Sequence, residues 1–510
     1  MTQPPFFITT PIYYSNDIPH IGHAYSTFIA DIIARDRRAC GYDVRFSTWV
    51  DENSQKVVEK ALEREMDLLE YVDSMAAKHR GVWDALDISY TDFVRTYHPS
   101  QTATVQYMLQ KSFDNDDIYL GEYEGAYCVG CEAFKKPSDL TPDGMCPIHK
   151  KPVQFLKEKN YFFRLKKYEQ ALIEFYQNTP DFIMPENRRN EIVEFIKGGL
   201  EDFSVSREWA TFGIALPFDP SHVTYVWYDA LFNYVSILVS GGELGSGGVI
   251  DHHWPADVHV MGKDITRFHW VYWLAMLMSV GLDLPKKLLT TGYLTLNGEK
   301  MSKSLGNVVN PVEYIETYSR DLLVNYLILW ASIGGDGDFS EEESVVLYNA
   351  HLANNFGNLV NRLTHLWKKV YGDATEANVL SRETRVKIEA IQAKSRAFGD
   401  AYDLRWKLEY LFESARDINK SLDTSAPWKL SLDDEDVKSQ YRSILWNALF
   451  EIIAISREMT PYFPAKMGHL LSCFDLNFEK GDLTLCAEVW VLFPRFECQN
   501  VTKKGKSDEK

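Results

Sequence analysis

Short apolar runs alternate with longer amphipathic stretches at the start of the chain. The run at 6–10 is apolar, β-branched and bounded by prolines, which predicts a buried parallel strand. Isoleucines then recur at helical spacing over 29–33, and Gly41 follows as the residue expected just beyond the helix end. A second strand is predicted at 44–50, and helical patterns follow at 55–64 and 68–86.

This strand and helix pattern returns later in the chain, after an interruption. It predicts an α/β fold whose first domain is a Rossmann-type parallel sheet, interrupted by an insertion of different composition and followed by a C-terminal α-helical bundle. The expected segments are 1–115 for the first half of the Rossmann-type domain, 116–215 for the insertion, 216–285 for the second half, 286–345 for a region with a Lys/Ser loop, 346–500 for the helical domain and 501–510 for a disordered tail.

Composition narrows the function classes. The 510 residues carry a net charge of -18, which argues against broad electrostatic binding to nucleic acid and leaves room only for local basic patches. Seven cysteines in this length do not make a disulfide scaffold. There is no signal-peptide pattern and no apolar run of membrane length, so the sequence predicts a cytoplasmic protein with no membrane partner.

The stretch at 19–25 stands where the first strand ends and the first helix begins. His20 and His23 are three residues apart, with Gly22 between them, so both imidazoles can face one side of the first helical turn. Helix N-termini at the carboxyl edge of a parallel sheet suit phosphate groups, and two imidazoles there can donate hydrogen bonds to phosphate oxygens. Taken alone, the pair could equally be ordinary cap or core histidines.

A second charged stretch follows the apolar run at 288–296. Five consecutive residues of the stretch 298–307 contain two lysines, Lys300 and Lys303, and two serines. A Lys/Ser loop between glycines suits closure over a polyphosphate, although such a loop is more often a solvated turn.

Four residues of the insertion have the spacing of a structural zinc site. Cys128 and Cys131 form one pair, and Cys146 and His149 form a second pair further along the chain. Prolines and glycine between the pairs predict a loop-rich segment with little core, which a metal would stabilise. Free thiols or a transient disulfide are the alternative.

Other polar residues occupy expected ligand-binding positions. Asp51 directly follows the second strand, where it could hold an ammonium group or cap a helix. Gly262 and Asp264 end a later predicted strand at the same kind of edge. Trp227, Phe268 and His269 form an aromatic group that is either core packing or a pocket for a polarisable side chain.

One helix of the C-terminal region has a polar face. Asn354, Asn358 and Arg362 are spaced four apart, and Trp428 lies at a break between later helices. Such a polar ladder beside an aromatic ring suits unstacked bases, although a solvated face with a core tryptophan explains the same pattern.

Together, the stretches 19–25 and 298–307 resemble the HIGH and KMSKS signatures of the class I aminoacyl-tRNA synthetases, and nearly the whole chain resembles the methionyl-tRNA synthetase family. The matching segments are 10–14, the zinc-type spacing, 160–165, 199–207, 226–230, 262–265, 336–340, 354–362 and 426–428.

This resemblance implies activation of L-methionine with ATP and Mg2+, followed by transfer to the 2′-hydroxyl of the terminal adenosine of tRNA(Met), both initiator and elongator. It implies catalytic roles for His20, His23, Lys300 and Lys303, and ATP binding by these residues with Gly22, Gly262 and Asp264. It implies a methionine site formed by Ile12, Tyr14, Asp51, Trp227, Tyr234 and His269, and anticodon contacts from Asn354, Asn358, Arg362 and Trp428. Cys128, Cys131, Cys146 and His149 would hold one structural Zn2+, and 286–345 would include the region that contacts the tRNA stem.

The chain departs from the family pattern at 47–54, where Trp49 replaces the usual glycine and Asn53-Ser54 replaces the usual His-Gly pair. No appended C-terminal module follows residue 500, so a monomer is predicted. A cysteinyl-tRNA synthetase, a non-catalytic tRNA-binding paralogue and a small-molecule nucleotidyltransferase are the alternative functions.

Overall fold

The computed structural model describes residues 3–128, 133–135, 140–147, 150–208, 212–263, 265–301, 307–330, 335–371, 376–377, 380–477, 482–485 and 491–499. The chain divides into two compact units. The N-terminal unit comprises Met1–Ala30, Gly41–Tyr293 and Ile333–Gly335, and the helical unit comprises Asp31–Cys40, Leu294–Ser332 and Asp336–Lys510.

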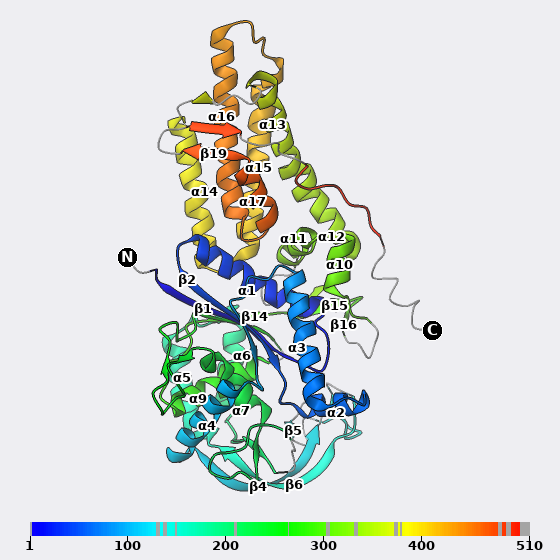
Figure 1. Cartoon of the computed structure of the whole chain (residues 1–510), viewed down its shortest axis with the longest axis vertical. Coiled ribbons are helices and arrows are strands. Elements are labelled where there is room, and N and C mark those ends of the chain that lie inside the picture. Colours follow the sequence, from blue (N-terminus) through cyan, green and yellow to red (C-terminus); the bar gives the residue numbers. More distant parts are fainter. Residues whose placement is uncertain are drawn as a thin grey trace. The chain divides into compact units, whose positions relative to one another are not determined.

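The N-terminal unit is built on a six-stranded parallel sheet in the order β3-β2-β1-β13-β14-β7 (Figure 1). The strands are β1 (Pro5–Tyr14), β2 (Asp43–Asp51), β3 (Asp92–Arg95), β7 (Ile183–Met184), β13 (Val258–Gly262) and β14 (Leu288–Thr291). Strand order reverses between β1 and β13, so the carboxyl ends of these two strands flank the point where a doubly wound sheet binds its ligands. The parallel sheet predicted from the sequence is confirmed.

Helices cover both faces of this sheet. Tyr13 of β1 reaches Thr27 of α1 (Ile21–Ala39) with a hydroxyl-to-hydroxyl distance of 2.8 Å, whereas Trp49 of β2 packs on Tyr234 of α8 (Asn233–Ser236). Since side chains alternate along a strand, these contacts place α1 on one face and α8 on the other. The remaining helices of this unit are α2 (Gln55–Glu63), α3 (Leu68–Ala85), α4 (Pro99–Asp114), α5 (Glu169–Asn178), α6 (Glu186–Lys197), α7 (Val226–Leu231) and α9 (Trp273–Ser279).

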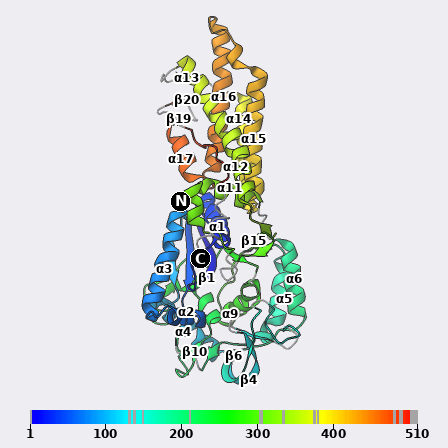
Figure 2. The same cartoon turned by 90° about the vertical axis from the view of Figure 1, so that its right-hand side faces the viewer.

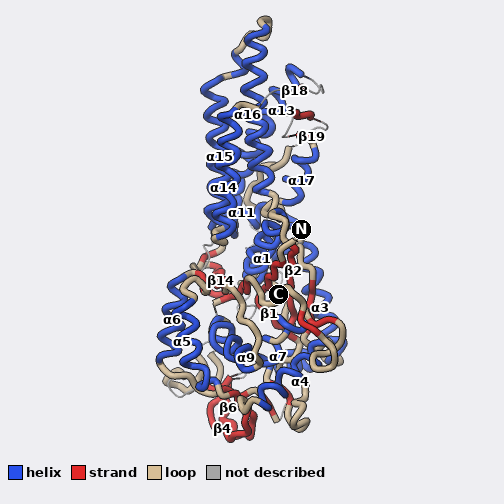
Figure 3. The backbone as a smooth tube through the Cα atoms, turned by 90° about the vertical axis from the view of Figure 1, so that its left-hand side faces the viewer, coloured by secondary structure: helices blue, strands red, loops and turns tan. Residues whose placement is uncertain are grey.

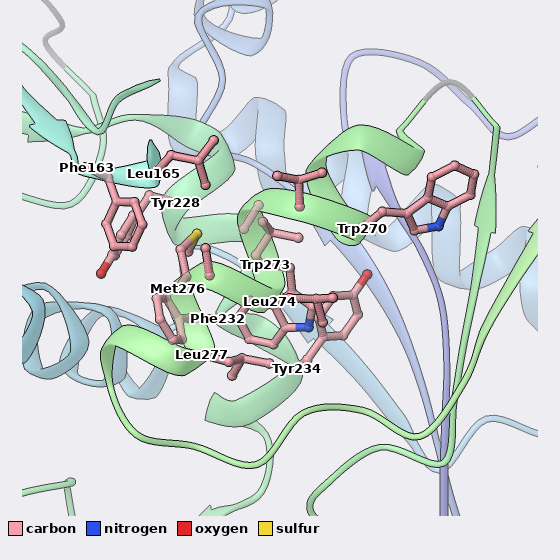
Figure 4. Close-up of a cluster of buried hydrophobic side chains, with 14 of the residues drawn as sticks. Phe163, Leu165, Tyr228, Phe232, Tyr234, Trp270, Trp273, Leu274, Met276 and Leu277 are labelled. Carbon is pink, nitrogen blue, oxygen red and sulfur yellow. The ribbon is translucent and has the colours of Figure 1, made fainter. Parts of the chain in front are cut away.

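A large aromatic and aliphatic core fills the space on the α8 face. Figure 4 shows Tyr234 of α8, Trp273 of α9 and Phe232, which lies between α7 and α8, packed together, with the rings of Tyr234 and Trp273 5.7 Å apart. Trp49, Tyr234 and Trp273 are fully buried. Burial of rings of this size supplies a large part of a core's stabilisation.

The predicted insertion contains an antiparallel sheet in the order β5-β4-β6-β8. Its long ribbon pairs β4 (Ile118–Cys128) with β6 (Gln154–Phe163), and β5 (Ala133–Lys135) and β8 (Phe203–Ser204) lie at its edges. Figure 2 shows α5 and α6, which follow β6, lying side by side.

In the helical unit, α14 (Arg382–Asp400), α15 (Leu404–Ser425) and α16 (Glu435–Met459) pack on one another (Figure 3). The other helices are α10 (Pro311–Thr317), α11 (Arg320–Trp330), α12 (Glu341–Tyr348), α13 (Asn358–Tyr371) and α17 (Pro464–Ser472). The helical C-terminal region predicted from the sequence is confirmed. Among the described residues, no helix is long and apolar enough to cross a membrane.

Two segments are wound as π-helix, which the sequence pattern did not predict. They are η5 (Asn349–Gly357), which precedes α13, and η3 (Phe268–Tyr272), which precedes α9. A π-turn widens the helix and changes the direction of the side chains it carries. Both segments carry residues that the sequence singled out, His269 in η3 and Asn354 in η5.

Candidate active site

The N-terminus of α1 is closed by two reciprocal hydrogen bonds between histidines and backbone. The backbone N–H of Gly22 donates to Nδ1 of His20 at 3.0 Å, and the backbone N–H of His20 donates to Nδ1 of His23 at 3.1 Å. The two bonds resemble a capping box, with imidazole nitrogens as the acceptors, except that the N-cap ring of His20 accepts from the second helical residue and not from the third. The two rings are 4.0 Å apart, so the prediction that they share one side of the first turn is confirmed.

This capping arrangement assigns the tautomer of both rings. A nitrogen that accepts an N–H bond carries no proton, so in each neutral ring the proton lies on Nε2. Each imidazole of His20 and His23 therefore has an Nε2–H group for donation at a helix N-terminus, where anions are favoured. A Cβ atom on Gly22 would come within 2.9 Å of the His20 ring, so glycine is required for this geometry.

On the α8 face of the sheet, side chains that are opposite one another on neighbouring strands form rows across the sheet. Tyr14 is opposite Asp51, and one row further from the carboxyl edge Ile12 is opposite Trp49, which is in turn opposite Val94. Residues two apart on a strand share a face, so both rows point to the same side of the sheet. Asp51 is buried, and its Oδ1 accepts the backbone N–H of Asn53 at 3.1 Å.

Aromatic side chains from α7 and η3 lie near Tyr14, in the row closest to the carboxyl edge of the sheet. Trp227 is stacked on Phe268 with ring centroids 3.8 Å apart, and its edge faces Tyr14 at 6.4 Å. The sequence analysis grouped Phe268 with Trp227 and His269, but the methionine site implied by the resemblance did not include it.

Tyr234 and His269 form a hydrogen-bonded pair beside these rings. The Tyr234 hydroxyl is 2.8 Å from Nε2 of His269, and Nδ1 of His269 is 3.1 Å from the carbonyl oxygen of Ile265. The carbonyl can only accept, so Nδ1 carries the proton and the tyrosine donates to Nε2. Burial lowers the pKa of His269 to about 4, so the ring is uncharged at neutral pH. The side chains of this pair and of Trp227 and Phe268 therefore form an uncharged, polarisable group.

Glu52, next to Asp51, points to different partners. Its Oε1 accepts a bond from Nε of Arg95 at 2.7 Å, and its Oε2 accepts the backbone N–H of Tyr97. Burial raises the pKa of Glu52 to about 7, although the Arg95 guanidinium acts in the opposite direction.

We expect this carboxyl group to make stability depend on pH. Because the folded state holds the Glu52 proton more tightly than the unfolded state does, its contribution is greatest below pH 4.5 and declines as the pH rises to about 7. The decline is at most roughly 3 kcal/mol, the free energy equivalent of a shift of this size. Urea unfolding of the wild type and Glu52→Gln from pH 4.5 to pH 8 measures it, and equal pH slopes in the two proteins would contradict the assignment.

Several predicted site residues lie outside the described residues, namely Asp264, Lys303, Cys131, His149 and the side chain of Lys300. Lys300 ends the short strand β16 (Glu299–Lys300) in the helical unit, and Gly262 ends β13 at the carboxyl edge of the parallel sheet. The described members of the predicted zinc site, Cys128 and Cys146, are both buried. Cys146 lies in a tight turn, where the Lys150 N–H donates to its carbonyl oxygen at 2.7 Å.

Another group of metal-binding residue types lies at the opposite end of β2. Asp43, His252 and His253 offer ligand atoms within 4.8 Å of one another, and Asp43 and His252 are exposed. Nδ1 of His253 is already 2.5 Å from Oδ1 of Asp251. Since Asp43 begins the strand that Asp51 ends, this group is separate from the candidate active site.

In the helical unit, two of the predicted anticodon residues are exposed and a third contacts Trp428. Asn354 and Asn358 are exposed, and the guanidinium carbon of Arg362 lies 4.3 Å from the centroid of the half-exposed Trp428 ring. Arg362 also pairs with Asp423 at 2.7 Å. Ala426 adopts a left-handed conformation (φ +39°) at the end of α15 and turns the chain so that Trp428 reaches Arg362.

Known proteins resemble this chain over most of its length. A family model described as tRNA synthetases class I (M) matches residues 6–154 and 135–364. A methionine–tRNA ligase of Thermotoga maritima is 41% identical over 466 residues, which is 90% of this chain and 73% of that protein. A methionine–tRNA ligase of Rickettsia conorii is 38% identical over 514 residues, covering 96% of this chain and 99% of that protein.

Solved structures agree with these sequence matches. The methionyl-tRNA synthetase of Mycobacterium tuberculosis, solved in complex with methionyl-adenylate, is 33% identical, with a TM-score of 0.91 over 97% of this chain and 100% of that chain. This likeness extends over the parallel sheet, the insertion and the helical C-terminal region together. The chain belongs to the methionyl-tRNA synthetase family of class I tRNA synthetases.

Proposed function

We propose that this chain is a methionine–tRNA ligase that activates L-methionine with ATP and transfers the methionyl group to tRNA(Met), initiator and elongator alike. The observation that supports this best is the site geometry of the N-terminal unit. A pair of histidine rings and a group of uncharged aromatic side chains lie at the same carboxyl edge of one parallel sheet.

The methionine side chain lies in the pocket formed by Ile12, Tyr14, Trp227, Tyr234 and His269. Thioether sulfur packs well on aromatic rings, and the neutral His269 adds no charge that would favour a polar substrate. The carboxylate of Asp51, one row nearer the sheet edge than Ile12, binds the ammonium group.

ATP lies at the α1 N-terminus. The Nε2–H groups of His20 and His23 donate to phosphate oxygens, and Gly22, Gly262 and Asp264 form the rest of the nucleotide site. The methionine carboxylate attacks the α-phosphorus, the bond to the bridging oxygen of the β-phosphate breaks, and pyrophosphate leaves. Donors fixed in place before the reaction stabilise the charge that gathers on these oxygens.

Two lysines and two metal ions complement the residues at the α1 N-terminus. Lys300 and Lys303 neutralise charge on the departing pyrophosphate, and Mg2+ bound to the ATP phosphates supplies further neutralisation. A structural Zn2+ held by Cys128, Cys131, Cys146 and His149 would stabilise the insertion, and the two described thiols fit because both are buried and Cys146 begins a tight turn. The enzyme acts as a cytoplasmic monomer.

The anticodon is read by Asn354, Asn358, Arg362 and Trp428 in the helical unit. The amides are exposed for contact with base edges, and the Trp428 ring offers a face for stacking, held in place by Arg362.

We expect Trp428→Ala to spare adenylate formation and to weaken charging of tRNA(Met) by about 1–3 kcal/mol, the usual effect of losing one base stack. The measurement compares kcat/KM for tRNA with the rate of ATP–pyrophosphate exchange. Trp406→Ala is the matched control, because Trp406 is 55% exposed in the same unit and has no proposed role. Equal losses in both assays would mean that Trp428 acts only in folding.

The experiment that tests the proposed function is amino-acid-dependent ATP–pyrophosphate exchange, with methionine and cysteine assayed side by side. Exchange with methionine alone is expected. Exchange with cysteine alone would contradict the pocket assignment, and exchange with neither would favour a non-catalytic tRNA-binding protein.

A further inference from the structure

We propose that Trp49 is a specificity-determining residue of this enzyme, which closes the floor of the methionine pocket and so limits the length of the side chain that the pocket accepts. The proposal rests on the pocket assigned above.

The strand register places Trp49 one row further from the carboxyl edge of the sheet than Asp51, the proposed anchor of the substrate. Asp51 and Trp49 are two residues apart on β2 and share a face, which puts their rows about 6.6 Å apart at the usual rise of a strand. With the ammonium group on Asp51, an extended side chain that points away from the sheet edge reaches the row of Ile12 and Trp49. An unbranched side chain of four heavy atoms, as in methionine, spans about this distance.

The Trp49 indole also packs against Tyr234, a residue of the proposed pocket. Trp49 is fully buried, and its ring meets that of Tyr234 edge to face, with centroids 5.2 Å apart and planes at 84°. The Tyr234 hydroxyl in turn donates to His269, so the position of this pair depends on the Trp49 ring. Val94, opposite Trp49 on β3, closes the far side of the row.

The polar atom of Trp49 provides a second observation. Its indole Nε1–H is buried and has no hydrogen-bond partner among the described residues. A buried donor without a partner is costly, so hydrogen bonding by Nε1–H to the described chain does not explain tryptophan at this position. The indole's size and shape remain as its contribution, which is what a pocket floor requires.

Removing the ring should therefore lengthen the pocket rather than only weaken the enzyme. In Trp49→Gly we expect kcat/KM for methionine to fall and kcat/KM for its S-ethyl analogue, ethionine, to rise. One methylene group in an apolar pocket changes discrimination by 10-fold or more, so the methionine-to-ethionine ratio should fall by about that factor. Trp49→Phe is the matched control, because it keeps an aromatic ring at the floor and should hold the ratio within about 3-fold.

ATP–pyrophosphate exchange with both amino acids measures these ratios for the wild type and each variant. Trp49→Leu is included in case the glycine variant does not fold, and it should shift the ratio in the same direction by a smaller factor. A lower kcat/KM with an unchanged ratio in the leucine variant would overturn the proposal and leave Trp49 a packing residue. Wild-type protein without methionine-dependent exchange would instead overturn the proposed function as well.

Discussion

His20→Asn should slow methionyl-adenylate formation by about 10²–10³-fold while leaving the protein as stable as the wild type. Asparagine is among the best N-cap residues, and its Oδ1 can take the place of Nδ1 and accept the Gly22 N–H. It has no group at the position of Nε2, so the proposed donor to phosphate is lost. Losing one preorganised donor to transition-state charge has an effect of this size.

His20→Ala serves as the control that separates the two roles of this ring. It removes both the cap and the donor, so its rate should match that of His20→Asn, whereas its free energy of unfolding should be lower by about 1 kcal/mol. Single-turnover adenylate formation and thermal unfolding are measured on both variants. An asparagine variant that keeps its rate within about 3-fold would remove the Nε2–H group from the mechanism.

Asp51→Asn should lower kcat/KM for methionine by roughly 10²–10³-fold with little change in KM for ATP. Asp51 is 3% exposed, so an ammonium group bound as we propose would be withdrawn from water and would depend on this carboxylate. Removing one partner of such a buried charge pair costs about 2–5 kcal/mol. The amide keeps the Oδ1 acceptor for the Asn53 N–H, so the local backbone should be preserved.

Glu52→Gln is the matched comparison for Asp51→Asn. It neutralises the neighbouring carboxylate, whose described partners are Arg95 and the Tyr97 backbone, and it should leave KM for methionine near the wild-type value. Pyrophosphate exchange at varied methionine and at varied ATP gives both constants. Similar losses in the two variants would mean that general charge, and not Asp51 itself, holds the substrate.

Local patterns in the sequence predicted much of the N-terminal unit. The apolar run before His20 forms β1, and the isoleucine spacing forms α1, which Gly41 follows with a φ of +86°. Each of these depends on residues close together in the chain, where sterics, capping and side-chain periodicity decide the conformation. Asp51, predicted to follow the second strand directly, is the last residue of that strand.

The walls of the pocket could not be predicted in this way. Trp49 and Tyr234 meet across a sequence separation that no periodicity reports, and the stack of Trp227 on Phe268 depends on the packing of α7 against a π-helical turn. The sequence left open that the two histidines are cap residues but did not predict their reciprocal bonds, because capping patterns are usually sought among hydroxyl, amide and carboxylate side chains. The residues of the methionine site were assigned from resemblance, and the structure supplies the distances.

Strand β1 contains a register irregularity between Thr9 and Ile12, which affects how this strand can change length in evolution. Thr9 is opposite Ser47 and Ile12 is opposite Trp49, so β1 has one residue more than β2 over this interval. Pro11, which has no N–H to donate, lies in the surplus. Deleting one residue at Thr10 or Pro11 would leave Ile12 and Tyr14 in register with their partners. A deletion within 12–14 or 49–51 would turn pocket side chains to the opposite face, so we expect natural length variation in β1 to fall at the irregularity.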